Sequence, residues 1–269
     1  MGWIRNASPE VAGQSRYLMV VSVCAVSVPL MTLIVILRGY HCLRINKNGR
    51  LSYYHLCLYT AFAVVYIVLA IIQTRLGLGL PSDILPKANL ELYTLLGYVE
   101  NLAYILARAA YNLALGFAAL DYCKRATDST HQRIFRLGII SIVLAHLVSF
   151  LLFLLSCQPI ERAWMPQTDG KCLAARPLSY GTSIAMLVTN LVAILLPIPL
   201  LCKLQLTKSE RVRPIALTLL GLLTPVCSVA RVCQIETMIN HGDSTMLVVW
   251  GIVENCVGAS TDLTSTICW

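Results

Sequence analysis

The sequence predicts an all-α, polytopic membrane protein with seven transmembrane helices, its N-terminus outside and its C-terminus in the cytoplasm. Two observations predict this fold class. Hydrophobic residues form 57% of the 269-residue chain and gather into seven long stretches, and a helix of about 20 apolar residues crosses roughly 30 Å of hydrocarbon. The Lys and Arg residues, in turn, concentrate in alternate connecting loops, as in membrane proteins of fixed orientation.

The seven stretches differ in how clearly the sequence marks them as spans. The first contains no charged residue and predicts a helix by its length alone. The third contains Glu100 and Arg108, and the seventh contains Glu254 and Asp262, so the seventh is the weakest prediction. The expected spans are residues 17–37, 51–74, 92–120, 137–156, 178–202, 214–233 and 246–267.

Basic residues predict the orientation of these helices. The loops after the first, third and fifth spans carry 12 of the 21 Lys and Arg residues, whereas the tail and the other loops carry 7. Because basic loops remain cytoplasmic, residues 1–16 should form an extracytoplasmic tail before a seven-helix domain of residues 17–267. Asn6 begins an Asn-Ala-Ser sequon in that tail and is a candidate glycosylation site. The first apolar run is too long for a cleavable signal peptide and should remain as a span.

The net charge of +8 is divided among short loops and does not gather on one face. Nucleic acid is therefore excluded as the expected partner, and anionic membrane lipid is favoured. We expect a multi-pass protein of the plasma membrane or an endomembrane. The sequence contains no CxxC pair, phosphate loop, dinucleotide fingerprint or nucleophile triad, so we expect no metal and no cofactor.

Two of the eleven cysteines, Cys157 and Cys172, lie in the predicted outer loop between the fourth and fifth spans. An oxidising lumen allows a disulfide there to persist. Closing a loop of that length would contribute about 3 kcal/mol and hold the loop as a lid on the bundle. The alternative is a pair of free thiols.

This loop also carries a family resemblance. Cys157, Pro159, Trp164, Gly170 and Cys172 resemble the Cys-x-Pro, Trp, Gly-x-Cys outer loop of the fungal rhodopsin-domain integral membrane proteins. Further similar motifs follow in order, namely Leu196-Pro197-Ile198-Pro199, Lys203-Leu204-Gln205-Leu206, Ser228-Val229-Ala230-Arg231, and Trp250 with Glu254. The resemblance implies a receptor-like membrane protein or one encoded beside mycotoxin and other secondary-metabolite enzymes.

The chain also departs from that family's pattern. Tyr54 and His55 stand where relatives usually have paired aspartates, and Asn190 replaces an aspartate of the fifth span. The usual lysine of the third span is replaced near Tyr111. Retinal is not expected despite the family's name, because it is held on a lysine and residues 246–267 contain none.

Ionisable groups within a span are costly and mark candidate sites. At about 100° per residue, Asn101, Arg108 and Asn112 fall within about 40° of one another and form one polar face of the third span. A similar polar face of the seventh span begins at Glu254. A third polar face, on the sixth span, ends at Arg231. The candidate ligand-binding residues are Asn101, Arg108, Asn112, Arg231 and Glu254, and the candidate catalytic acids are Glu254, Glu100 and Asp262.

Two interpretations of these residues remain open. Arg108 could pair with Glu100 or Glu254 only to neutralise charge and set the helix register. Alternatively, the polar faces line a pocket in which Arg108 binds an anionic or carbonyl oxygen and Glu254 acts as an acid or base. The extent of the polar faces beyond one ion pair narrowly favours the pocket.

Two classes of function are compatible with these residues. The first is a receptor-like or accessory membrane component that senses or handles an apolar metabolite made by neighbouring fungal enzymes. The second is an intramembrane cyclase or isomerase that moves protons through Glu254, Glu100 or Asp262. A transporter ranks third, because the chain has few spans and no visible internal repeat.

Overall fold

The computed structural model of the chain describes residues 3–44, 50–126, 129–196, 198 and 208–268. For residues 41–44, 50, 82, 121–126, 129–131, 208–218, 220 and 262–268 it describes the backbone alone. In these described parts the chain is almost entirely helical, which confirms the all-α membrane fold.

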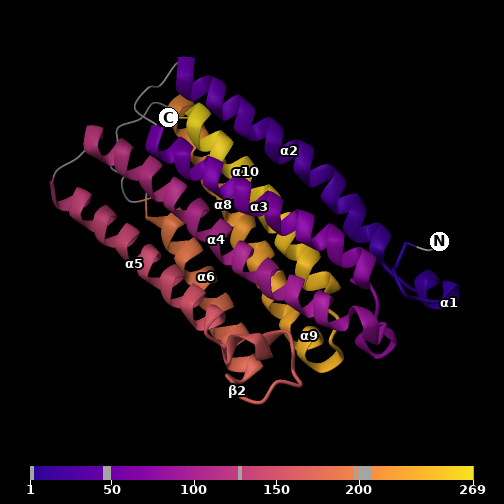
Figure 1. Cartoon of the computed structure of the whole chain (residues 1–269). Coiled ribbons are helices and arrows are strands. Elements are labelled where there is room, and N and C mark those ends of the chain that lie inside the picture. The colour runs from indigo at the N-terminus through magenta and orange to yellow at the C-terminus, as the bar shows by residue number, and fades with distance from the viewer. Residues whose placement is uncertain (1–2, 45–49, 127–128, 197, 199–207, 269) are drawn as a thin grey trace.

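Long antiparallel helices form the body of the molecule (Figure 1). Each helix contacts the next along the chain, and the last contacts the first, so that the helices close into a ring. These helices are α2 (Tyr17–Arg44), α3 (Arg50–Leu76), α4 (Lys87–Ala126), α5 (Ser129–Leu154), α6 (Ala175–Leu195), α8 (Lys208–Cys233) and α10 (Thr245–Cys268).

Helix α4 is the central helix of the bundle. It contacts α3, α5, α6 and α10, and 61% of its most apolar window is buried, against 22–33% for the other candidate spans. Ala103, Ala107, Ala110 and Ala114 lie buried along it, and such small side chains let neighbouring helices approach closely. The polar residues of α4 therefore face protein and not lipid.

Within the described ranges, six helices are long and apolar enough to cross a membrane, and Thr245–Thr261 of α10 is a shorter apolar stretch. This agrees with the sequence, in which the seventh span is the weakest. Several helices extend beyond the expected spans: α4 begins at Lys87, before the expected residue 92, and Pro214 lies inside α8. Helix α5, in contrast, ends at Leu154, two residues before the expected end of the fourth span. Helix α6 ends at Leu195, and most of the remaining expected fifth span lies outside the described residues. The orientation in the membrane stays a prediction.

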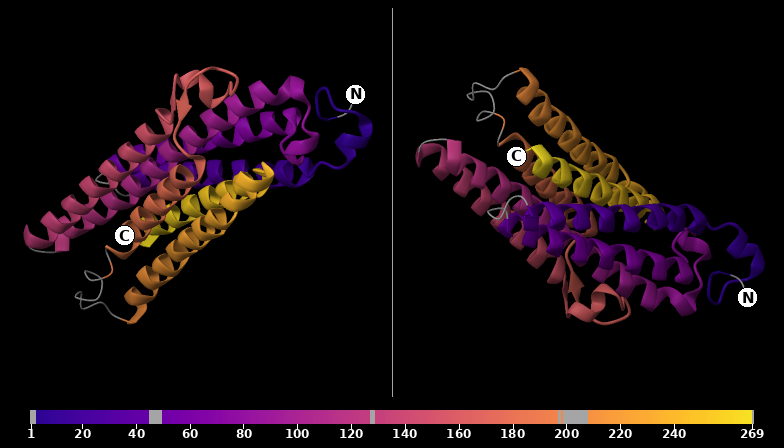
Figure 2. Two further views of the ribbon diagram at one scale, coloured as in Figure 1. Left: turned by 90° about the horizontal axis from the view of Figure 1, so that it is seen from below. Right: turned by 90° about the horizontal axis from the view of Figure 1, so that it is seen from above.

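Short elements gather at the end of the bundle where the N-terminus lies, and the C-terminus lies at the opposite end (Figures 1 and 2). They are α1 (Pro9–Gly13), η2 (Ser82–Ile84), the hairpin of β1 (Cys157–Gln158) and β2 (Lys171–Cys172), η3 (Ile160–Ala163) and α9 (Ile235–His241). In the hairpin Cys157 stands opposite Cys172, and the two are disulfide-bonded. The predicted disulfide is confirmed.

Candidate ligand-binding site

A buried ion pair joins α4 to α10. Arg108 Nη2 lies 3.5 Å from Glu254 Oε1, and each side chain is only 1% exposed. Of the two partners that the sequence allowed for Arg108, the structure therefore selects Glu254. Burying either charge alone would be strongly unfavourable, so the pair constrains how α4 and α10 are placed against each other.

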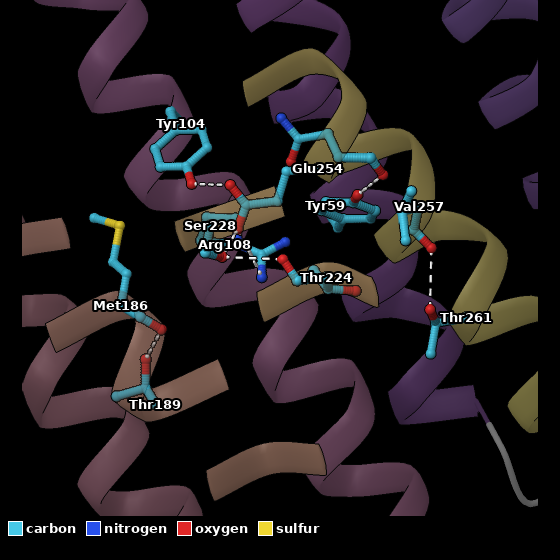
Figure 3. A network of polar contacts seen from close by, with 11 residues as sticks. Tyr59, Tyr104, Arg108, Met186, Thr189, Thr224, Ser228, Glu254, Val257 and Thr261 are labelled. Atoms are coloured by element: carbon cyan, nitrogen blue, oxygen red, sulfur yellow. Dashed lines mark hydrogen bonds and ion pairs between the residues drawn. The ribbon is translucent and has the colours of Figure 1, made fainter. Parts of the chain in front are cut away.

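Glu254 also accepts two hydrogen bonds from hydroxyl groups (Figure 3). The Tyr104 hydroxyl donates to Oε2 at 2.5 Å, and the Ser228 hydroxyl donates to Oε1. The carboxylate thus links α4, α8 and α10 at one level of the bundle. The polar faces that the sequence predicted on the third, sixth and seventh spans do meet in the interior.

Two tyrosines of α3 pack against α10 and bind its backbone. The Tyr66 hydroxyl donates to the carbonyl oxygen of Val248 at 3.2 Å, and the Tyr59 hydroxyl donates to that of Asn255. The glycines of α10 make room for these rings, because a Cβ on Gly251 would overlap the Tyr66 hydroxyl. The close packing of α3 against α10 leaves the ion pair without contact with solvent.

The other two candidate acids do not take part in this network. Glu100 is buried two turns before Arg108 on α4 and accepts a hydrogen bond at 2.5 Å from Gln73 of α3. Its Oε1 has no hydrogen-bond partner. The side chain of Asp262 lies outside the described part of the chain, so its role as a catalytic candidate stays a prediction.

Arg231 of α8 is held apart from the ion pair. Its guanidinium lies over the Tyr104 ring, 3.9 Å from the centroid, and its Nη2 lies 3.5 Å from Asn101 Oδ1. The residue is 7% exposed, and its Nε has no hydrogen-bond partner. Arg231 and Asn101, both predicted as ligand-binding residues, are therefore neighbours across α4 and α8.

A cavity of about 130 Å³ lies beside Arg231 and Asn101. It is lined by residues of α4, α5, α6, α8, α9 and α10, so most of the bundle contributes to its wall. The lining combines polar groups with apolar side chains, and consists of Asn101, Tyr104, Ile105, Phe153, Ser179, Thr182, Ser183, Met186, Arg231, Ile235, Met238 and Leu247. A mainly apolar pocket with a few converging polar groups is the usual form of a small-molecule site.

One wall of this cavity is secured by contacts at the protein surface. Glu236 of α9 accepts a hydrogen bond at 3.0 Å from Arg176 of α6, and Arg176 also donates to Asn240 at 2.7 Å. Tyr180 donates to the same carboxylate at 3.3 Å. Because these groups hold α9 against α6, Ile235 and Met238 are kept at the cavity.

The remaining predicted binding residue, Asn112, does not line the cavity. It lies one turn beyond Arg108 on α4, is 1% exposed, and its Oδ1 has no hydrogen-bond partner. Arg108 does not line the cavity either. Of the five predicted ligand-binding residues, only Asn101 and Arg231 reach the cavity directly.

The comparison with protein families decides which family the chain belongs to. A family model described as the fungal rhodopsin domain matches residues 37–261. The chain belongs to the fungal rhodopsin domain family. The match covers most of the chain and confirms the resemblance seen in the outer loop and in the later helices. No curated protein and no solved structure matches the chain significantly.

Family membership and the apolar helices identify a multi-pass membrane protein. That the domain binds no retinal stays a prediction. It rests on the sequence of α10, which contains no lysine to hold retinal. Among the residues that the structure describes, no three His, Cys, Asp or Glu side chains gather where they could hold a metal ion. The expectation of no metal likewise stays a prediction.

Sequence reasoning missed the contribution of α6 to the cavity of the fungal rhodopsin domain. Ser179, Thr182, Ser183 and Met186 all line it, and their spacing of three, four and seven residues places them on one helical face. That spacing was a usable signal. It was missed because hydroxyl groups and a methionine are ordinary residues in a membrane helix, unlike a buried charge.

Asn6, the predicted glycosylation site, lies on the exposed surface at the end of the bundle where the N-terminus lies. Its Nδ2, the atom that would carry the sugar, donates a hydrogen bond at 2.8 Å to Asn89 Oδ1. Asn89 in turn donates to the carbonyl oxygen of Arg5 at 2.7 Å. Whether Asn6 is modified stays a prediction.

Proposed function

We propose that this protein is a receptor-like or accessory component of a fungal membrane that binds a small, largely apolar metabolite inside its helical bundle. The observation that carries the proposal is the cavity beside Arg231. It combines an apolar wall with a buried cation and several hydroxyl groups, the arrangement that orients a small molecule bearing one polar group.

The position of the acids favours binding over catalysis. A general acid or base must lie within hydrogen-bonding reach of the proton that it moves. Neither Glu100 nor Glu254 lines the cavity, because Glu100 turns toward Gln73 and Glu254 lies behind Tyr104. We therefore propose a ligand that is bound without being converted.

Ligand retention tests this proposal. The protein is purified from its native host in nanodiscs, and small molecules extracted from it are identified by mass spectrometry. Ser183→Phe fills the cavity, whereas Ile184→Phe places the same ring on the adjacent exposed position. We expect a molecule that co-purifies with the wild-type protein and with Ile184→Phe but not with Ser183→Phe. Equal retention by both variants would contradict the proposal.

We further propose that the bound molecule belongs to secondary metabolism, such as a mycotoxin or its precursor. The support is the resemblance of the outer loop and later helices to membrane proteins encoded beside such enzymes. Deleting the gene and profiling the host's metabolites tests this. Unchanged secondary metabolites in the deletion strain would restrict the role to signalling.

An intramembrane cyclase or isomerase is the second candidate, and one contact favours it. Tyr104 lines the cavity and donates its hydroxyl hydrogen bond to Glu254 at 2.5 Å, so a proton could pass between the cavity and the carboxylate. Tyr104→Phe keeps the ring over which Arg231 lies and removes only the hydroxyl. An uncyclised precursor that accumulates in a host carrying normal amounts of this variant would select the enzyme.

A further inference from the structure

Arg231 is a buried cation that makes no direct ion pair with an acid among the described side chains. Among the residues whose side chains the structure describes, no carboxylate oxygen lies within 4.0 Å of its guanidinium. Glu254 and Glu100 act on Arg231 only at longer range. The nearest contacts of these acids are with other residues, because Glu254 pairs with Arg108 and Glu100 accepts a hydrogen bond from Gln73. A buried charge without a direct partner is costly, and membrane proteins normally supply such a partner.

The hydrogen-bonding capacity of Arg231 is also unfilled. Its Nε has no partner, and the contact of its Nη2 with Asn101 is long, at 3.5 Å. The guanidinium lines the cavity together with Ser179 and Ser183, which lie one turn apart on α6. The planar group can donate two parallel hydrogen bonds, a geometry that matches a carboxylate.

The remaining wall of the cavity determines the size and polarity of the rest of the ligand. Ile105, Phe153, Met186, Ile235, Met238 and Leu247 supply apolar surface around the polar group. The cavity volume of about 130 Å³ is close to the roughly 150 Å³ that accommodates benzene in an engineered apolar cavity. A single ring or a short branched chain therefore fits, with one acidic group directed at Arg231.

We propose that the cavity binds small apolar carboxylic acids in their ionised form, with the carboxylate on Arg231 and the hydrocarbon body against α5, α6 and α9. This inference rests on the proposed binding function and names the class of its ligand. The carboxylate of the ligand supplies Arg231 with the direct ion-pair partner that no described side chain provides.

Three probes of similar shape test whether binding requires a negatively charged group on the ligand. The full-length protein in nanodiscs is titrated calorimetrically with benzoate, benzamide and benzyl alcohol, which share a ring and differ in the polar group. We expect benzoate to bind roughly 10- to 100-fold more tightly than the two neutral probes, the difference that hydrogen bonds to a charged group provide. Arg231→Gln should abolish this preference, and Arg231→Lys should retain part of it. Arg136→Gln, which removes an exposed arginine, should not change it.

A second measurement separates ligand recognition from a structural role. If Arg231 serves to bind an external ligand, Arg231→Gln should not lower the Tm of the ligand-free protein, because it removes a buried charge that makes no direct ion pair. A clearly lower Tm would overturn the inference. So would failure of all three probes to bind, or equal affinities for them. If all three probes bind equally tightly and Ser183→Phe abolishes their binding, only the ligand class is overturned. If Ser183→Phe does not affect their binding, the proposed function is contradicted as well.

Discussion

Arg108 shows how a charged residue is accommodated at the centre of an apolar bundle. It sits on the most buried helix, where Glu254 supplies the opposite charge and the Tyr111 ring lies 4.6 Å from the guanidinium carbon. Tyr104 and Ser228 satisfy the carboxylate from two other directions. The cost of burying two ions is offset only when such additional hydrogen bonds are present.

The first prediction concerns this pair. Glu254→Gln leaves Arg108 without a counter-charge and should lower stability by about 3–5 kcal/mol, whereas Arg108→Met combined with Glu254→Gln should recover most of the loss. The measurement is the Tm and the folded fraction in detergent. Because Glu254 anchors Tyr104 at the cavity, we expect the double variant to fold and to lose ligand retention. Full retention would limit the pair to a structural role.

The second prediction concerns Gly251. Its missing Cβ makes space for the Tyr66 hydroxyl, so Gly251→Ala should destabilise the protein by about 1–3 kcal/mol through overpacking. Gly181→Ala is the matched control, because nothing lies within 4 Å of its added Cβ, and alanine stabilises a helix relative to glycine. The Tm should fall for the first and not for the second. Tyr66→Phe should partly rescue Gly251→Ala, and failure to rescue would place the clash elsewhere.

Among the secondary-structure elements, the disulfide-bonded hairpin is the clearest example of local stabilisation. The bond between Cys157 and Cys172 closes a loop across 15 residues. The loop is also tied to α4, because the Thr94 hydroxyl donates to the carbonyl oxygen of Trp164 at 2.9 Å. The Trp164 ring packs near Tyr98, also on α4. The loop therefore covers the end of the bundle next to the central helix.

The third prediction is that replacing Cys157 and Cys172 together by alanine lowers stability by about 3 kcal/mol, because the unfolded chain regains the freedom of the loop. Thermal unfolding of the purified protein measures the change. Cys233→Ala removes an exposed free cysteine and should have no comparable effect. An unchanged Tm in the double alanine variant would show that the contacts with α4 hold the loop without the bond.

For the whole molecule, the two termini lie at opposite ends of the bundle (Figure 2). An odd number of crossings would produce this arrangement, so we expect α10 to be a crossing although its described apolar stretch is shorter than the other six. The described helix ends next to two of the basic loops, namely the end of α2, the start of α3 and the start of α5, lie at the same end of the bundle as the C-terminus. From the positive-inside rule we expect the basic end to face the cytoplasm.

The fourth prediction follows from this orientation. A reporter fused after Trp269 should be cytosolic, and a protease-accessible tag before residue 3 should be on the opposite side. The measurement is protease protection in sealed vesicles of known orientation. Glycosidase treatment of the wild-type protein, with Asn6→Gln as control, then shows whether the exposed sequon is used. A lumenal C-terminal reporter would overturn the seven-span topology.

Much of the architecture could be predicted from the sequence alone. Apolar length marks a span without knowledge of its neighbours. The expected spans each lie on a long helix, except that the fourth runs two residues past α5 and the fifth runs past α6, largely into residues that are not described. The Cys157–Cys172 bond was predictable because both residues share one short loop. The polar faces of α4, α8 and α10 were predictable because helical periodicity relates residues within one helix. All of these are properties of single segments or of short loops.

Only the tertiary structure decided which polar groups meet. Periodicity places Arg108, Glu100 and Glu254 on faces of their own helices, but the rotation and the axial position of each helix choose Glu254 as the partner. The same packing directs Arg231, and not Arg108, to the cavity, and adds a face of α6 that carries no charge. The composition of a segment determines whether it enters the membrane, because that depends on transfer from water to lipid. A binding site depends on the distances between side chains of different helices, and these are set by the packing of the whole bundle.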